Sequence, residues 1–119
     1  MVRPPVYRCC QPWLLLEAVD GERAVFLDLA QIFRQETVDR YDDIARASAA
    51  GATRDMGFDA HSLKGTVGTV GASELVQLLQ QIEDAGLKHV RPCSAGQLAQ
   101  LRQMLQLARD DMDTFVASL

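Results

Sequence analysis

The stretch that decides the fold is "AHSLKGTVGTVGASEL", residues 60–75, because one helical pattern ends in it and another begins. A series of apolar residues begins just before this stretch and continues into it at steps of three and four, as the buried face of a helix requires. They are Met56, Ala60, Leu63, Val67 and Val70. A second series follows Gly71, at Leu75, Leu78, Leu79 and Ile82. The sequence therefore predicts helices over residues 53–70 and 72–87 that turn back on each other at Gly71.

Three further helices are predicted outside this pair. Residues 13–19 form a short apolar segment, residues 22–49 contain neither proline nor glycine, and residues 94–119 carry one regular apolar stripe. No strand-like alternation competes with these patterns. The fold class is all-α, an antiparallel four-helix bundle with a short additional N-terminal helix. Residues 1–12, with three prolines, are expected to be a flexible lead-in to a bundle domain over residues 13–119.

Side chains that could cap the helices precede three of them. Ser94 with Gln97 has the spacing of a capping box, in which each side chain accepts from the other residue's backbone amide. Asp20 and Thr53 are candidate N-caps for the helices that follow them.

Composition excludes several classes of protein. The 119 residues include 12 basic and 16 acidic ones, a net charge of −4, and such a chain has no basic patch for nucleic acid. The longest early apolar run, residues 13–16, is too short for membrane insertion. An odd number of cysteines, Cys9, Cys10 and Cys93, favours a reducing compartment. We expect a cytoplasmic, monomeric protein.

A second set of residues with helical spacing lies beside the apolar stripe of residues 53–70. It comprises Gly57, His61, Lys64, Gly65 and Gly68. One interpretation is an exposed imidazole whose approaches are cleared for another macromolecule, with a cation one turn away to hold an anion. The other is a surface histidine on a helix whose glycines allow a neighbouring helix to pack closely. Spacing alone leaves both open.

The motif "AHSLKGTVGTVGASEL", with "LLQQIEDAGL" at residues 78–87, resembles the histidine-containing phosphotransfer (HPt) domains of bacterial phosphorelays. The matching residues are Ala60, His61, Leu63, Lys64, Gly65, Gly71 and Ala72. At motif level the resemblance covers residues 53–87, and the helix layout extends it to residues 13–119.

The resemblance implies a phosphoryl carrier rather than an enzyme with autokinase activity. His61 would accept a phosphoryl group from the aspartyl phosphate of one receiver domain and pass it to the aspartate of another. Lys64 would neutralise the phosphate, and Gly57, Gly65 and Gly68 would form the docking surface. The implied partners are response-regulator receiver domains and a hybrid sensor kinase, and no cofactor or metal of its own is expected.

The chemistry also needs a group that orients the imidazole, because the attacking nitrogen must keep its lone pair. His61 lies ten residues before Gly71 and Glu83 twelve residues after it, which places them at similar heights on adjacent antiparallel helices. Glu83 is the candidate acceptor for the imidazole N–H, and Gln80 is the alternative.

Two other functions remain open at this stage. The chain could be an adaptor that binds a receiver or kinase through the same glycine-lined face without chemistry. It could also be a structural or dimerisation bundle, which exposed apolar residues on the second helix would support. The other histidine, His89, has no catalytic or metal-binding neighbours in the sequence and is expected to be solvated.

Overall fold

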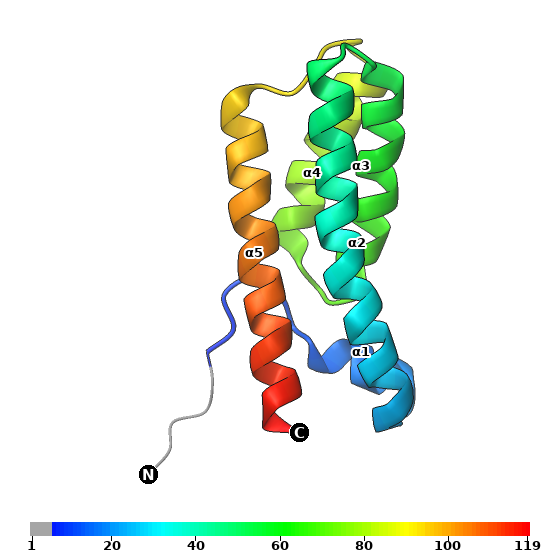
Figure 1. Cartoon of the computed structure of the whole chain (residues 1–119), viewed down its shortest axis with the longest axis vertical. Helices are drawn as coiled ribbons and strands as arrows, with labels where there is room; N and C mark the ends of the chain where they lie inside the picture. Colours follow the sequence, from blue (N-terminus) through cyan, green and yellow to red (C-terminus); the bar gives the residue numbers. More distant parts are fainter. Residues whose placement is uncertain (1–5) are drawn as a thin grey trace.

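The computed structural model describes residues 6–119, and the regular secondary structure of this part is entirely helical. They are α1 (Trp13–Ala18), α2 (Arg23–Ala49), α3 (Thr53–Gly68), α4 (Ser73–Leu87) and α5 (Ala95–Ser118). Figure 1 shows the four longer helices side by side with α1 at the lower end. The predicted four-helix bundle with a short N-terminal helix is therefore confirmed.

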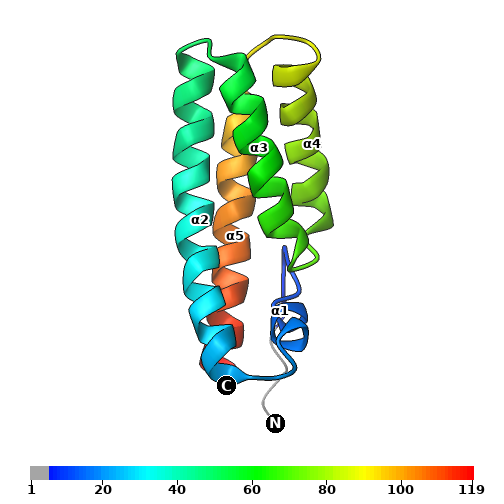
Figure 2. The same cartoon turned by 90° about the vertical axis from the view of Figure 1, so that its right-hand side faces the viewer.

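The bundle is uneven because its helices differ in length. α2 has 27 residues and α5 has 24, whereas α3 has 16 and α4 has 15. At 1.5 Å per residue, the first two helices are about 36–40 Å long and the other two about 24 Å. The α3–α4 pair thus lies beside the upper part of α2 and α5, and α1 lies beneath it (Figure 2).

The core follows the apolar stripes that the sequence predicts. The apolar stripe predicted over residues 53–70 is fully buried at Met56, Ala60, Leu63, Val67 and Val70. It faces the stripes of α4 and α5, which include Leu75, Leu79, Ile82, Leu101, Leu105 and Met112. Phe26 and Ile44 of α2 complete the interior. Burial of these side chains supplies most of the stabilisation of the bundle.

One of the three predicted caps is confirmed and two are wrong. The Ser94–Gln97 capping box is formed, with both hydrogen bonds at 3.1 Å. The residues at the N-cap positions of α2 and α3 are Glu22 and Ala52, and neither makes a side-chain capping bond. Asp20 instead takes a left-handed φ of 55° in the preceding turn, and Thr53 is already the first residue of α3.

The segment before α1 makes several hydrogen bonds to the bundle within the described residues. The carboxylate of Asp111 on α5 accepts hydrogen bonds from the backbone amides of Arg8, Cys9 and Cys10 at 2.6–3.0 Å. The amide of Gln11 donates to the carbonyl of Val70 at 2.7 Å. Residues 1–5 of the predicted lead-in lie outside the described residues.

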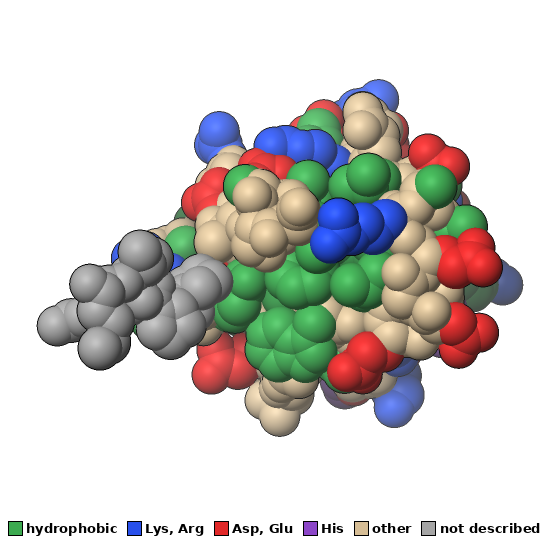
Figure 3. Space-filling model, turned by 90° about the horizontal axis from the view of Figure 1, so that it is seen from below, with side chains coloured by type: hydrophobic (Ala, Val, Ile, Leu, Met, Phe, Trp, Pro, Cys, Tyr) green, Lys and Arg blue, Asp and Glu red, His purple; other side chains and the backbone are tan. Residues whose placement is uncertain are grey.

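Aromatic side chains join this segment to the lower end of α5. The ring of Tyr7 contacts Trp13 and Phe115 edge to face, with centroids 5.4 and 6.4 Å apart. Phe115 in turn contacts Phe26 of α2. Figure 3 shows this end from below, where apolar side chains fill the middle of the surface. Nothing among the helices of residues 6–119 is both long enough and apolar enough to cross a membrane.

The Asp111 contacts generate a stability prediction. Asp111→Ala should lower the free energy of unfolding by about 2 kcal/mol or more, because three backbone amides lose a charged acceptor in a largely buried position. Denaturant unfolding measures the change. Asp110→Ala is the matched control, since Asp110 is exposed, and it should stay within about 0.5 kcal/mol of the wild type. Equal effects of the two variants would contradict the role of Asp111.

Candidate functional site

The site is built on the α3–α4 pair, which the turn at Gly71 makes antiparallel. Gly71 takes a left-handed φ of 63°, a conformation that glycine adopts without strain. The buried stripe of α3 holds that helix against α4, so its rotation about its own axis is set. That rotation places His61 on the outer side, with 65% of its side chain exposed.

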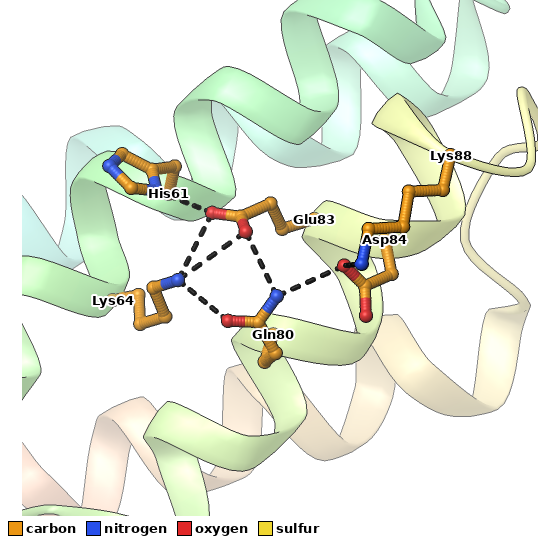
Figure 4. A network of polar contacts seen from close by, with 6 residues as sticks. All are labelled: His61, Lys64, Gln80, Glu83, Asp84 and Lys88. Atoms are coloured by element: carbon orange, nitrogen blue, oxygen red, sulfur yellow. Dashed lines mark hydrogen bonds and ion pairs between the residues drawn. The ribbon is translucent and has the colours of Figure 1, made fainter.

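Glu83 of α4 contacts the imidazole directly. Its Oε1 lies 2.5 Å from His61 Nδ1, and 13% of the Glu83 side chain is exposed. An ionised carboxylate has only acceptors, so Nδ1 is the nitrogen that carries the proton. Neutral imidazole has one proton, and Nε2 therefore keeps its lone pair. The second ring nitrogen points away from Glu83 in Figure 4.

Three hydrogen-bond donors keep the Glu83 carboxylate ionised although it is largely covered. Burial alone would raise the pKa of Glu83. Hydrogen bonds from His61, Gln80 and Lys64, together with the charge of Lys64, outweigh this effect and lower the pKa below its ordinary value. Glu83 is therefore an anion at neutral pH, as the assignment of the His61 proton requires.

Lys64 turns toward α4 rather than toward the free side of the imidazole. Its Nζ lies 2.7 Å from Gln80 Oε1 and 3.2 and 3.3 Å from the two carboxylate oxygens of Glu83. Only 21% of the Lys64 side chain is exposed. The ammonium thus has an acceptor for each of its three protons within the network.

Gln80 links the members of the network and does not contact the ring. Its Nε2 donates to Glu83 Oε2 at 2.9 Å and to Asp84 Oδ1 at 3.0 Å, while its Oε1 accepts from Lys64. Asp84 pairs with Lys88 at 3.4 Å, which completes the chain of contacts drawn in Figure 4. Of the two residues proposed to orient His61, the structure places Glu83 against the imidazole and Gln80 behind Glu83.

Two glycines leave the face below His61 open. A Cβ atom added at Gly65 or Gly68 would meet nothing within 4 Å, and both residues are exposed. One turn on the other side of His61, Phe58 is 50% exposed, and the guanidinium of Arg54 lies 5.5 Å from its ring centroid. His61 therefore stands on a surface that a second macromolecule can approach closely.

Gly57 does not belong to this open face, so its assignment to the docking surface is wrong. It is buried, and an added Cβ would lie 2.6 Å from Leu87 Cγ on α4. Its spacing from His61 is helical, but Leu87 and the backbone carbonyl of Glu83 on α4 pack against it. The interpretation in which glycines allow close helix packing is correct for this residue.

Sequence reasoning missed the role of Gly86, although the predicted helix over residues 72–87 includes it. The structure places Gly86 in the last turn of α4, buried against the backbone of α3. A pattern of apolar residues cannot reveal such a contact, because glycine contributes no side chain to the pattern. The other histidine, His89, is exposed as expected.

The site consists of an exposed histidine and the hydrogen-bond network that supports it, and it does not form a pocket. An open groove of about 1080 Å³ lies between α2 and α5, and none of its lining residues belongs to the network around His61. Within residues 6–119, no group of three or more His, Cys, Asp or Glu side chains could hold a metal ion. Such a surface suits a macromolecular partner better than an enclosed small molecule.

Comparison with known families agrees with the motif. The model of the Hpt domain matches residues 28–111, which is more than half of the chain and includes His61, Lys64, Gln80 and Glu83. Searches of curated proteins and of solved structures gave no match. The chain therefore belongs to the Hpt domain family, whose members are phosphotransfer domains of two-component signalling.

Proposed function

We propose that this chain is a phosphoryl carrier in which His61 Nε2 accepts a phosphoryl group from the aspartyl phosphate of one receiver domain and passes it to the aspartate of another. The observation that supports this most strongly is the 2.5 Å contact between His61 Nδ1 and the largely covered Glu83 carboxylate. It leaves Nε2 unprotonated and outward-facing on a side chain that is 65% exposed.

The transfer needs little from the protein beyond position and charge. The Nε2 lone pair forms a bond to phosphorus while the bond from phosphorus to the aspartyl oxygen breaks, and the aspartate leaves as a carboxylate. The imidazole becomes positively charged, and Glu83 stabilises that charge through the Nδ1–H hydrogen bond. Attack by the aspartate of a second receiver on the same phosphorus breaks the Nε2–P bond and returns the ring to its first state.

In-line transfer between two proteins requires the reacting atoms to come within about 3–3.5 Å of each other. Gly65 and Gly68 provide the clear surface on which a receiver domain would dock, since neither presents a side chain beside His61. The partners we propose are response-regulator receiver domains and a hybrid sensor kinase. The chain would supply no cofactor of its own.

Lys64 would act on both sides of the reaction. In the unphosphorylated protein its Nζ holds Glu83 and Gln80. Once His61 carries a phosphoryl group, rotation of the flexible Lys64 side chain would bring the ammonium toward the added negative charge. Lys64 would thus hold Glu83 in place before transfer and neutralise the phosphoryl group after it.

A purely structural function gains little support from the second helix. Four apolar side chains of α2 are 41–56% exposed: Val25, Leu27, Ile32 and Val38. At 100° per residue, Val25 and Ile32 share one side of the helix, and Leu27 and Val38 share another. Scattered exposed apolar residues of this kind are ordinary on protein surfaces.

The adaptor function differs from the carrier function only in that no phosphoryl group is transferred, so labelling of His61 decides between them.

One prediction concerns the phosphoacceptor. Incubation with a phosphorylated receiver or a small phosphodonor should label the wild-type chain with an acid-labile, alkali-stable phosphate. His61→Gln should abolish the label because it removes the nucleophile, whereas His89→Gln should be labelled like the wild type. Persistent labelling of His61→Gln would refute the carrier function, and receiver binding without transfer in either direction would favour an adaptor.

Another prediction concerns Glu83. Glu83→Gln should slow labelling of His61 by about tenfold or more, because the ring loses the charged acceptor that selects its tautomer and stabilises its positive charge. The rate of labelling by a small phosphodonor measures this without receiver docking. Glu74→Gln, at an exposed position in the first turn of α4, is the matched control.

Protein stability tests the charge of Glu83 independently of transfer. The folded-state pKa of Glu83 is lowered from 4.5, so ionised Glu83 stabilises the fold above about pH 4.5, and this contribution is lost as the pH falls through the lowered pKa. The difference in unfolding free energy between wild type and Glu83→Gln should therefore shrink under acid. A constant difference would mean that folding does not lower the pKa of Glu83.

A further prediction concerns Lys64. Lys64→Ala should slow labelling by about tenfold and shorten the lifetime of the phosphohistidine. The reason is that the Lys64 ammonium holds Glu83 before transfer and neutralises the phosphoryl group after it. Helix content by circular dichroism should not change. Arg102→Ala, which removes an exposed positive charge from α5, is the control. Unchanged rate and lifetime in Lys64→Ala would show that Lys64 takes no part.

A further inference from the structure

α3 and α4 touch backbone to backbone where Gly86 meets Gly57. A Cβ atom added at Gly86 would lie 2.3 Å from the carbonyl oxygen of Thr53, and 2.9 and 3.0 Å from the N and Cα atoms of Gly57. Real Cβ atoms essentially never approach within 3.0 Å of another heavy atom. All three neighbours are backbone atoms, so no side-chain rotation relieves the overlap. Any larger residue at position 86 must push the two helices apart.

This contact lies one helical turn from the candidate site on both helices. Gly57 precedes His61 by four residues, and Gly86 follows Glu83 by three, so each glycine lies on the same side of its helix as the functional residue. The two chain segments also meet directly, because a Cβ at Gly57 would lie 3.3 Å from the backbone carbonyl oxygen of Glu83. A change in the distance between the helices at the glycines would therefore also change the distance between His61 and Glu83.

We propose that the Gly57–Gly86 contact is a positioning element that holds Glu83 within reach of His61 and so determines which ring nitrogen is free. The inference rests on the proposed function of His61 and adds residues that do not touch the reacting atoms. Gly86 is the principal positioning residue, since its neighbours are all backbone. Gly57 is secondary, since its closest neighbour is the movable side chain of Leu87.

The network has little tolerance for a wider spacing between the helices. The bonds from Lys64 to Glu83 are already 3.2 and 3.3 Å long, near the upper limit for a charged N–H···O bond. A small separation would break them first and remove a cation that helps to keep Glu83 ionised. It would then lengthen the 2.5 Å contact between His61 Nδ1 and Glu83.

A tautomer measurement separates positioning from simple packing. The ¹⁵N chemical shifts of the His61 ring report which nitrogen is protonated in the neutral imidazole, and labelling by a small phosphodonor reports reactivity. In the full chain, Gly86→Ala should raise the fraction of the Nε2–H tautomer several-fold and slow labelling by about tenfold, in the same direction as Glu83→Gln. Gly96→Ala is the matched control, because a Cβ there meets only Ser94 Oγ at 3.9 Å.

Gly57→Ala supplies the decisive variant if Gly86→Ala does not fold. Leu87 is 39% exposed, so its side chain can move away from the added Cβ atom. The close contact that then remains is with the backbone carbonyl oxygen of Glu83. Its tautomer shift should have the same direction and be smaller.

Wild-type tautomer populations in folded Gly86→Ala would overturn the inference, as would wild-type populations in Gly57→Ala where Gly86→Ala does not fold. The tautomer readout needs no phosphate. A wild-type chain that takes no label on His61 would therefore refute the proposed function while leaving the positioning role to be decided by the spectra.

Discussion

The ion pair and hydrogen bonds of the Glu83 carboxylate are the constraint on which the rest of the site depends. A carboxylate that is 13% exposed is costly to keep charged unless donors surround it. Here the donors are Lys64, Gln80 and the imidazole itself. Because the anion is stable, the proton of the imidazole is confined to Nδ1. The state of a solvent-exposed ring is thus determined by a group that solvent barely reaches.

The glycines around this network perform two opposite tasks. Gly65 and Gly68 leave space on the outer face, where an added Cβ would meet nothing. Gly57 and Gly86 allow α3 and α4 to pack in close contact, because an added Cβ at either position would overlap atoms of the other helix. Gly65, Gly68 and Gly57 lie within 12 residues of one helix, yet the neighbouring helix decides which task each performs. The cost in helix propensity, about 0.5–1 kcal/mol for each glycine, is offset by packing only for the second pair.

Sequence patterns predicted the helices well because each carries an apolar stripe of helical period, and the same period placed His61 off the core. Counting residues from Gly71 was enough to pair His61 with Glu83. The patterns failed where contacts depend on backbone or on residues distant in sequence. The anchoring of residues 8–10 by Asp111 spans about 100 positions, and the burial of Gly57 and Gly86 depends on how closely α3 and α4 approach. Neither leaves a periodic signal.

The unequal helix lengths explain why the site can be both rigid and open. α2 and α5 extend beyond the α3–α4 pair, and the segment before α1 fills the space beneath it through Asp111 and Val70. The lower turn of the pair is therefore fixed at Gly71, and its upper part is fixed at the Gly57–Gly86 contact. His61 and Glu83 lie between these two points. A phosphotransfer domain gains from such an arrangement, because the histidine is presented in one geometry without an enclosing pocket.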